Sequence, residues 1–476
     1  MITLFQNKLN KRLDTYNPFI ELLRNFRQKE FSLTVEGTEG FFFALVVERL
    51  FRYSESPFLI VTPTEQEAET LVRDLSMFTD RAYQFPWWNS VPYGAKHTQL
   101  NIAGKRMGQL VQMISGEPFI AVASLRAFLT PLPPPEFIRS KLLKLKVGQE
   151  FDPVQLTETL QSYRYLRVPR VTVAGEFALR GEVLDLFLPG DEQAIRIVFE
   201  WDQIEEIRSF DPLSQSSTGK LKEVTLYPVS EVVWDEDSKH KLKELLPKAE
   251  SLHDELESEN QCNDEVYFFP ATFEKPAAIS DYLDSHATPS LRCTDDRLAN
   301  GCESLQKEYS GLFREAKIKR RPALRPEYLI HRFENLEAAH HRTIHVPVLR
   351  DTQKKRIRFS YEGPRSFFGN ISYLKSELES LVENGYDITI CAETNSQAQK
   401  IEHLLRELDV AVIASPISSG FSIPEFKMMV VQENEIFGRR RRPPASVKKA
   451  KTAVIDTFVE LNPGDFVVHV NYGMIR

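Results

Sequence analysis

Cysteine is scarce in this chain, and the few cysteines are not spaced as metal ligands or disulfide partners. There are four, Cys262, Cys293, Cys302 and Cys391, and no two of them form a C-x-x-C motif. This spacing indicates neither a zinc site nor a disulfide framework. Free thiols in a reducing compartment are therefore expected.

The chain also lacks an excess of basic residues and any long apolar run. Its 476 residues include 60 Lys and Arg against 67 Asp and Glu, which gives a net charge of −7. No global positive field attracts nucleic acid, so a DNA contact would need a local basic patch. The opening residues, MITLFQNKLNKRLD, contain no apolar signal core, and no run reaches transmembrane length. We expect a cytoplasmic protein with no membrane contact.

What is present is an ordinary globular composition, with 42% apolar and 27% charged residues. The length predicts roughly three or four domains. No internal repeat and no Ser/His/Asp or paired-carboxylate set stands out, so no catalytic residues are predicted. Glu337, His340 and His341 could share a metal, but a solvated helix end is favoured because no second ligand cluster accompanies them.

The first part of the chain alternates strand and helix patterns. Residues 1–30 have the apolar spacing of an amphipathic helix. Strands are predicted at 31–35, 58–63 and 119–122, and helices at 42–53, 66–77 and 102–114. Thr64 and Ser124 are expected helix caps. This alternation predicts a parallel sheet covered on both faces.

The first strand of this region leads into a glycine turn without phosphate-binding chemistry. A strand that leads through a glycine turn, here Gly37 to Gly40, into a helix has the geometry of a phosphate loop. Such a loop needs a Lys for the outer phosphates and a Ser or Thr hydroxyl for magnesium, but Phe41, Phe42 and Phe43 stand there instead. We predict a P-loop-type fold that has lost its nucleotide site, hence no cofactor here. An ordinary βα turn would have the same consequence.

Residues 85–93 join two of these elements through an aromatic, proline-rich segment, FPWWNSVPY. Such a segment could stack nucleic-acid bases. Packing within a loop is the favoured interpretation. Further on, the apolar run Val266–Phe269 is predicted to be a strand, and the basic residues of 317–321 are taken as a solvated helix face.

Residues 163–234 consist of short strand-like runs separated by Gly, Pro and Asp, which predicts a small antiparallel sheet. Expected strands include 171–173, 177–179, 183–187 and 195–199. The outward-facing polar residues are mostly arginines: Arg164, Arg167, Arg170, Arg180 and Arg196.

Within this stretch, GEFALRGEVLDLFLPG followed by IRIVFEWDQIEEIRSFDPLSQ resembles a module of the excision-repair protein UvrB. It is more similar still to its counterpart in bacterial transcription-repair coupling factors (Mfd). In that family the module binds the damage-recognition subunit UvrA. The resemblance implies that Arg180 and Phe187 contact UvrA, followed by one of Arg167 and Arg170. On pattern alone, Phe187 would be core and the arginines a solvated face.

The end of the chain carries a second resemblance. After the basic run at 439–451, which is either a linker or a DNA-backbone contact, LNPGDFVVHVNYGMIR predicts a hairpin. It resembles the opening of the RNA-polymerase-interacting domain of coupling factors, a Tudor-like barrel. The residues that carry this likeness are Gly464, Asp465, His469 and Gly473.

We therefore predict a multidomain α/β fold in six segments. These are a degenerate helicase-like lobe (1–135), a UvrA-binding module (136–234), a return to the lobe (235–342), a small α/β domain (343–438), a basic linker (439–457) and the truncated start of a polymerase-binding domain (458–476). By resemblance, this is the N-terminal part of a coupling factor that recruits UvrA where RNA polymerase has stalled.

The resemblance implies further partners for the intact protein. It would contact the polymerase β subunit and move on double-stranded DNA, using ATP and Mg²⁺ in motor domains beyond this chain. One alternative is UvrB itself, an excision-nuclease subunit, against which the missing phosphate-loop Lys argues. Another is an α/β interaction scaffold without enzymatic activity.

Overall fold

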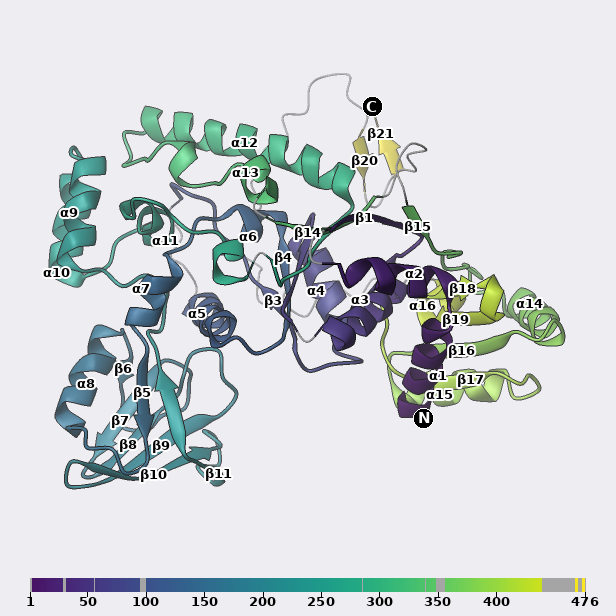
Figure 1. Cartoon of the computed structure of the whole chain (residues 1–476), viewed down its shortest axis with the longest axis horizontal. Coiled ribbons are helices and arrows are strands. Elements are labelled where there is room, and N and C mark those ends of the chain that lie inside the picture. Colours follow the sequence, from purple (N-terminus) through teal and green to yellow (C-terminus); the bar gives the residue numbers. More distant parts are fainter. Residues whose placement is uncertain are drawn as a thin grey trace.

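The computed structural model describes residues 2–28, 31–54, 56–94, 100–284, 286–338, 340–347 and 356–438, and two short strands at 467–469 and 473–475. In these residues the protein is a mixed α/β assembly built around sheets of seven, six and four strands. The six-stranded sheet projects at the lower left of Figure 1, and the four-stranded sheet lies at the right.

The seven-stranded sheet is parallel throughout, with the order β15-β1-β14-β13-β2-β4-β3. Its strands are β1 (Phe31–Glu36), β2 (Phe58–Thr62), β3 (Ala82–Phe85), β4 (Ile120–Ser124), β13 (Ser290–Cys293), β14 (Arg342–Val346) and β15 (Arg356–Arg358). The apolar runs predicted as buried strands form its centre, where every residue of β2 and β4 is buried. The predicted parallel sheet is confirmed.

Helices cover both faces of this sheet. Phe58 and Ile60 of β2 pack into one apolar cluster, and the alternate residues Leu59 and Val61 pack into another. The first cluster is covered by α1 (Ile2–Asp14), α2 (Asn17–Phe26), α3 (Gly40–Ser54) and α4 (Glu65–Leu75). The second is covered by α5 (Leu100–Ser115), α6 (Leu125–Leu129) and α12 (Asp295–Ile318), the long helix across the top of Figure 1.

Local chemistry explains where these helices begin. The predicted caps are confirmed: Thr64 Oγ1 accepts the Glu67 N–H at 3.2 Å, and Ser124 Oγ accepts the Ala127 N–H at 3.1 Å. The prediction of one helix over residues 1–30 is wrong, because α1 ends before Tyr16 and a second helix, α2, begins there with Pro18 in its first turn. Proline lacks the N–H that a continuous helix would need.

The six-stranded sheet has the order β11-β10-β9-β8-β7-β6. Its strands are β6 (Leu166–Arg167), β7 (Glu176–Arg180), β8 (Val183–Leu186), β9 (Ala194–Glu200), β10 (Gln203–Phe210) and β11 (Ser217–Leu221). Neighbours are antiparallel except β6 and β7. The predicted strand at 171–173 is wrong, because this segment is an irregular connection. Its Thr172 and Val173 N–H groups bond to the Glu176 side chain instead of to a strand.

The same module contains α8 (Pro153–Ser162) and a two-stranded ribbon, β5 (Leu143–Lys146) with β12 (Glu223–Leu226). Helix α7 (Pro135–Ser140) precedes it. After it come α9 (Glu236–Leu245), α10 (Glu250–Glu259) and α11 (Glu265–Phe268). The predicted strand at Val266–Phe269 is therefore wrong. An unbroken apolar run has no period that separates strand from helix, and here its residues are buried in the core.

The four-stranded sheet has the order β17-β16-β19-β18. It consists of β16 (Asp387–Ala392), β17 (Ala411–Ala414), β18 (Phe421–Ile423) and β19 (Met428–Gln432), with α14 (Ile371–Glu383), α15 (Asn395–Leu404) and α16 (Glu433–Phe437). The boundary predicted at residue 343 falls inside β14, and both β14 and β15 pair with β1 of the seven-stranded sheet. The four-stranded sheet itself begins at Asp387.

Helix α13 (Phe333–Ala338) lies between α12 and β14 in the chain. The described residues end with the hairpin of β20 (Val467–His469) and β21 (Gly473–Ile475). The hairpin was predicted, and its strands contain His469 and Gly473. Gly464, Asp465 and the segment 439–457 lie outside the described residues. Among those that are described, no helix has the length and apolar character needed to cross a membrane.

Candidate functional site

The two faces of the six-stranded sheet differ sharply in chemistry. Leu179 of β7, Leu184 of β8, Ile197 of β9 and Ile207 of β10 are cross-strand partners. Partners across strands share one face of a sheet. These four pack into the large apolar cluster of the protein. This face fixes the module, and the opposite face is left for other contacts.

The opposite face carries a row of charged side chains. Asp185 of β8, Arg196 of β9, Arg208 of β10 and Lys220 of β11 are successive cross-strand partners. Arg180 lies on the same face, because it is two residues after Ala178, the partner of Asp185. We call these five residues, with Glu206, the charged row.

Asp185 is the centre of the charged row. Its carboxylate is fully buried and accepts hydrogen bonds from two arginines. Arg196 bonds in bidentate fashion, Nε to Oδ1 at 2.6 Å and Nη2 to Oδ2 at 2.9 Å. Arg180 Nη2 reaches Oδ2 at 2.5 Å while half of its side chain, 51%, stays exposed. One buried carboxylate thus orients two guanidinium groups.

Further contacts fix the other cations of the charged row, Arg196, Arg208 and Lys220. The Arg196 guanidinium lies 4.8 Å from the centroid of the Phe210 ring, and its hydrogen bond to Asp185 raises its pKa. Glu206 pairs with Arg208 and, at 2.8 Å, with Lys220. These two hydrogen bonds lower the pKa of Glu206 to about 2. Glu206 therefore stays charged across the physiological pH range.

Phe187 does not lie at the surface of this face. It is 7% exposed and packs with Val171, Ala178, Ala194 and Phe210 in a small separate apolar cluster. The structure thus places it in the core, the position that its residue type alone favours. It supports the backbone beside the charged row.

The other two predicted arginines lie apart from Arg180. Arg170 is exposed and donates through Nη2 to the Leu213 carbonyl at 3.0 Å. Arg167, also exposed, is in register with Phe177, which packs into the opposite, apolar face. The register therefore brings Arg180 together with Arg196 and Arg208, and does not bring Arg167 into that row.

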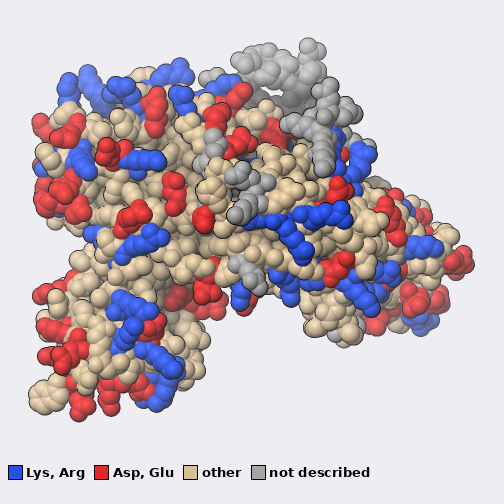
Figure 2. Space-filling model, viewed as in Figure 1, with Lys and Arg blue, Asp and Glu red and all other residues tan. Residues whose placement is uncertain are grey.

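The charged row has more positive than negative groups. Four cations, Arg180, Arg196, Arg208 and Lys220, stand against the two carboxylates of Asp185 and Glu206. Figure 2 shows Lys and Arg gathered through the middle of this module and acidic side chains along its outer edge. Half-exposed, pre-oriented guanidinium groups suit recognition of carboxylates on a partner surface.

Sequence reasoning missed Asp185, Glu206, Arg208 and Lys220. The alternation of β10, where Ile204 and Ile207 are buried and Glu206 and Arg208 point outward, was a usable signal. Asp185 gave none, because it lies in the run VLDLF between apolar residues and its two partners come from different strands.

The glycine turn after β1 leads directly into buried phenylalanines. Gly37 and Gly40 both have positive φ, and Phe41, Phe42 and Phe43 are buried behind them. Phe41 stacks on Phe78, with ring centroids 5.4 Å apart. A Cβ on Gly40 would collide with Ser419 Oγ, so the turn is covered by the segment before β18.

The aromatic segment at 85–93 is packed inside the protein. Trp88 is 1% exposed and Tyr93 5% exposed, and Tyr93 donates its hydroxyl to the Leu324 carbonyl at 2.5 Å. These two rings are therefore unavailable for stacking on bases. The loop-packing interpretation is confirmed for both.

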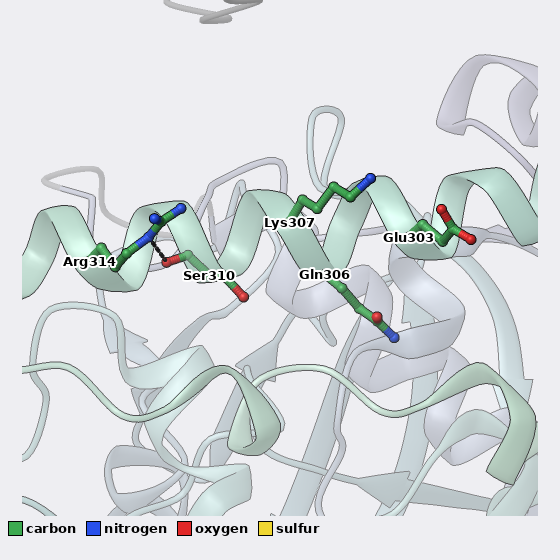
Figure 3. A pocket seen from close by; sticks show the side chains of 5 residues that line it. All are labelled: Glu303, Gln306, Lys307, Ser310 and Arg314. Atoms are coloured by element: carbon green, nitrogen blue, oxygen red, sulfur yellow. Dashed lines mark hydrogen bonds between the residues drawn. The ribbon is translucent and has the colours of Figure 1, made fainter.

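A second surface feature is a shallow groove on α12, shown in Figure 3. It is lined by Glu303, Gln306, Lys307, Ser310 and Arg314. All five come from one helix, and Lys307 points away from Gln306 and Ser310 (Figure 3). These side chains do not converge on a common point. In the described part of the chain, no three His, Cys, Asp or Glu side chains are grouped so as to hold a metal.

The module that contains the six-stranded sheet matches a known protein family. Residues 143–232 match the UvrB interaction domain family. The six-stranded sheet with its charged row, the ribbon β5–β12 and helix α8 all lie in the matched range.

Over most of its length the chain is similar to transcription-repair-coupling factors, which confirms the predicted resemblance. It is 25% identical to that of Borreliella burgdorferi over 96% of this chain. It is also 25% identical to that of Bacillus subtilis over 92% of this chain, and 23% identical to that of Staphylococcus epidermidis over 97%. The chain spans about two fifths of these relatives, 41%, 41% and 43% of their lengths.

A solved chain from "Crystal structure of GtfA/B complex" was also matched, at 9% identity. The match covers 75% of this chain and 76% of that one, with a TM-score of 0.14. It carries no argument about fold or function.

Proposed function

We propose that this chain recruits UvrA to lesions where RNA polymerase has stalled, through the charged row of its UvrB interaction domain. The observation that carries the proposal is the buried Asp185, which holds Arg180 and Arg196 on the open face of the sheet. A buried carboxylate that orients two arginines keeps their remaining N–H groups pre-organised for acidic groups of a partner.

In this proposal the residues of the module have different roles. Arg180, half exposed, contacts UvrA directly. Phe187 supports the sheet beneath the contact, since it is buried. Arg170 and Arg167 lie outside the row and add at most rim contacts, which contribute little to affinity.

The experiment compares UvrA binding by the wild-type chain and two arginine variants. Arg180→Ala should weaken binding roughly thirtyfold, the loss of about 2 kcal/mol that is typical of a central anchor. The matched control is Arg139→Ala in α7, whose side chain is 54% exposed against 51% for Arg180. It should bind like wild type. Circular dichroism should show that both variants are folded.

Asp185→Asn tests the orienting role. It keeps the size of the side chain but removes the charge that holds Arg180 and Arg196, so UvrA binding should fall although every arginine remains. Wild-type binding by Arg180→Ala would show that the site is elsewhere. Equal loss in Arg180→Ala and Arg139→Ala would indicate a non-specific charge effect.

The wider assignment follows from the coupling-factor relatives. We propose that the longer protein is an ATP-dependent translocase on double-stranded DNA that displaces stalled polymerase in the cytoplasm. ATP and Mg²⁺ would act in its motor region. The lobe around β1 would be a P-loop-type fold without nucleotide chemistry. The hairpin β20–β21 would open a Tudor-like domain that contacts the polymerase β subunit.

A further inference from the structure

A cavity of about 660 Å³ lies at the C-terminal edge of the seven-stranded sheet, between helix α4 and the segment before β18. Thr62, Cys293 and Val346, the last residues of β2, β13 and β14, line it, and so does Gly37, which follows β1. Ligands of open parallel sheets bind at this edge, and the volume is that of a small-molecule site. Because the glycine turn lacks phosphate-binding chemistry, the lining itself has to indicate what kind of ligand fits.

One face of helix α4 forms a wall of this cavity. Its lining residues are Glu67, Thr70, Leu71 and Asp74, and residues at this spacing share one face of a helix. Glu67 and Asp74 are seven positions apart, so their backbones are separated by about 10.5 Å along the helix axis, at 1.5 Å per residue. The apolar side chain of Leu71 comes between them in the sequence. The wall therefore carries two carboxyl groups separated by an apolar stretch.

Several buried polar atoms of the lining have no hydrogen-bond partner in the described structure. Thr38 is 3% exposed and its Oγ1 is unpartnered, as are Thr294 Oγ1 and Glu67 Oε2. A hydroxyl can donate or accept a hydrogen bond, whereas an ionised carboxylate oxygen only accepts. Glu67 Oε1 already accepts from Arg297 Nη1 at 2.5 Å. Glu67 Oε2 is therefore left to receive a donor from a bound molecule.

The charge of the lining indicates which donor fits. Among the described lining residues there are three carboxyl groups, Glu39, Glu67 and Asp74, and one cation, Arg297, which pairs with Glu67. Burial raises the pKa of Asp74 to about 6, so this carboxyl is mostly ionised at pH 8. The lining is then net negative. An anion would be repelled, a neutral molecule would leave the carboxylates uncompensated, and a cation with N–H donors would compensate them.

We propose that this cavity binds a linear aliphatic polyamine, with one ammonium group at Glu67 Oε2, a second at Asp74 and the carbon chain between them along Leu71. Ammonium groups only donate hydrogen bonds, which suits carboxylate oxygens and the unpartnered hydroxyls of Thr38 and Thr294. The separation of the two carboxyl groups favours a chain with an ammonium group at each end over a monoamine. The site is independent of the proposed UvrA contact, because the charged row lies on a different sheet.

The first test is calorimetric titration of the wild-type chain with spermidine at pH 8 and physiological salt. Binding should saturate at one spermidine per chain. Butylamine, with one ammonium group, and octanediol, which has a similar length but no charge, should bind at least tenfold more weakly. Absence of saturable spermidine binding would overturn the proposal, and so would equal affinity for either of the other two compounds. This test needs no variant and therefore does not depend on the folding of one.

The second test locates the site on α4 with Glu67→Gln and Asp74→Asn, each checked for folding by circular dichroism. Each variant removes one charge and nearly keeps the shape of the side chain, so each should weaken spermidine binding about tenfold, as expected for a lost charge-assisted hydrogen bond. The matched control is Glu69→Gln on the same helix, an exposed residue that is not among the described lining residues. It should bind like wild type. Equal weakening in Glu67→Gln and Glu69→Gln would indicate adsorption to an acidic surface and overturn the proposal, as would wild-type affinity in both cavity variants.

Discussion

Arg106 and Glu231 form a bidentate ion pair that is sealed from solvent. Arg106 Nε lies 3.1 Å from Oε2 and Nη2 lies 2.9 Å from Oε1, and the two side chains are 0% and 1% exposed. The guanidinium also lies 4.1 Å from the Trp88 ring and donates to the Pro86 carbonyl at 2.7 Å. The pair thereby joins α5 and the aromatic segment to Glu231, at the end of the matched module.

We predict that breaking this pair from one side is far costlier than replacing it. Arg106→Met leaves a buried carboxylate unpaired and should lower the free energy of unfolding by about 3–5 kcal/mol. The double variant Arg106→Met/Glu231→Leu should recover most of that loss, because two apolar side chains then face each other. Urea denaturation followed by circular dichroism measures all three proteins.

The exposed pair Arg139–Glu136 is the control for this cycle. Its side chains are 54% and 78% exposed, so Arg139→Met should change stability by less than about 1 kcal/mol. Additive losses in the Arg106/Glu231 double variant would contradict the prediction. They would mean that the two residues stabilise the fold independently of each other.

The sequence was sufficient for features that depend on neighbouring residues. The apolar run at 58–63 and the caps Thr64 and Ser124 are local patterns, and they predicted the parallel sheet and its helix starts. The same locality explains the failure at Val266–Phe269. Complete burial produces an apolar run whether the backbone is helical or extended.

Features that depend on distant residues could not be predicted. Arg106 and Glu231 are 125 positions apart, and neither residue type suggests burial. For the candidate site, the family resemblance pointed to Arg180, but only the register of β7, β8 and β9 reveals that Asp185 binds both Arg180 and Arg196.

A further prediction concerns the pH dependence of a contact between helix α4 and the segment before β18. The Asp74 carboxylate of α4 is buried and accepts the backbone N–H of Ser418, which precedes β18, at 2.9 Å. Burial raises the pKa of Asp74 from 3.8 to about 6, against the hydrogen bonds from Ser418. The folded protein therefore holds this proton more tightly than the unfolded chain does.

The sign of the effect follows from proton linkage. A raised carboxyl pKa gives stability that is complete below pH 3.8 and is lost as pH rises through about 6. Asp74→Asn keeps an acceptor for Ser418 without the charge. It should match wild type near pH 4 and exceed it at pH 8 by up to roughly 3 kcal/mol.

Denaturation across this pH range checks the Asp74 prediction, with the exposed Asp409→Asn as control. The control should track wild type at every pH. If Asp74→Asn were no more stable than wild type at pH 8, burial would not be the cause of the raised pKa.

The last prediction concerns the cavity where a nucleotide would lie in a working phosphate-loop protein. About 660 Å³ in volume, it lies at the C-terminal ends of β1, β14, β13 and β2. That edge of a parallel sheet is the usual place for a ligand. Its lining, however, includes the carboxylates Glu39, Glu67 and Asp74, and the one arginine among its described lining residues, Arg297, is paired with Glu67 at 2.5 Å.

We therefore predict that this chain binds neither ATP nor ADP. Among the described lining residues, the phosphates would meet three carboxylates and no lysine, and Ser419 packs against Gly40 of the glycine turn. Calorimetric titration with Mg-ATP should give no binding heat. Neutralising the lining with Glu39→Gln, Glu67→Gln and Asp74→Asn together should not create binding, because the Lys and hydroxyl that a phosphate loop needs are still absent. A micromolar dissociation constant for wild type would contradict the prediction. Binding by the neutralised variant alone would show that charge repulsion, rather than the missing Lys, excludes the nucleotide.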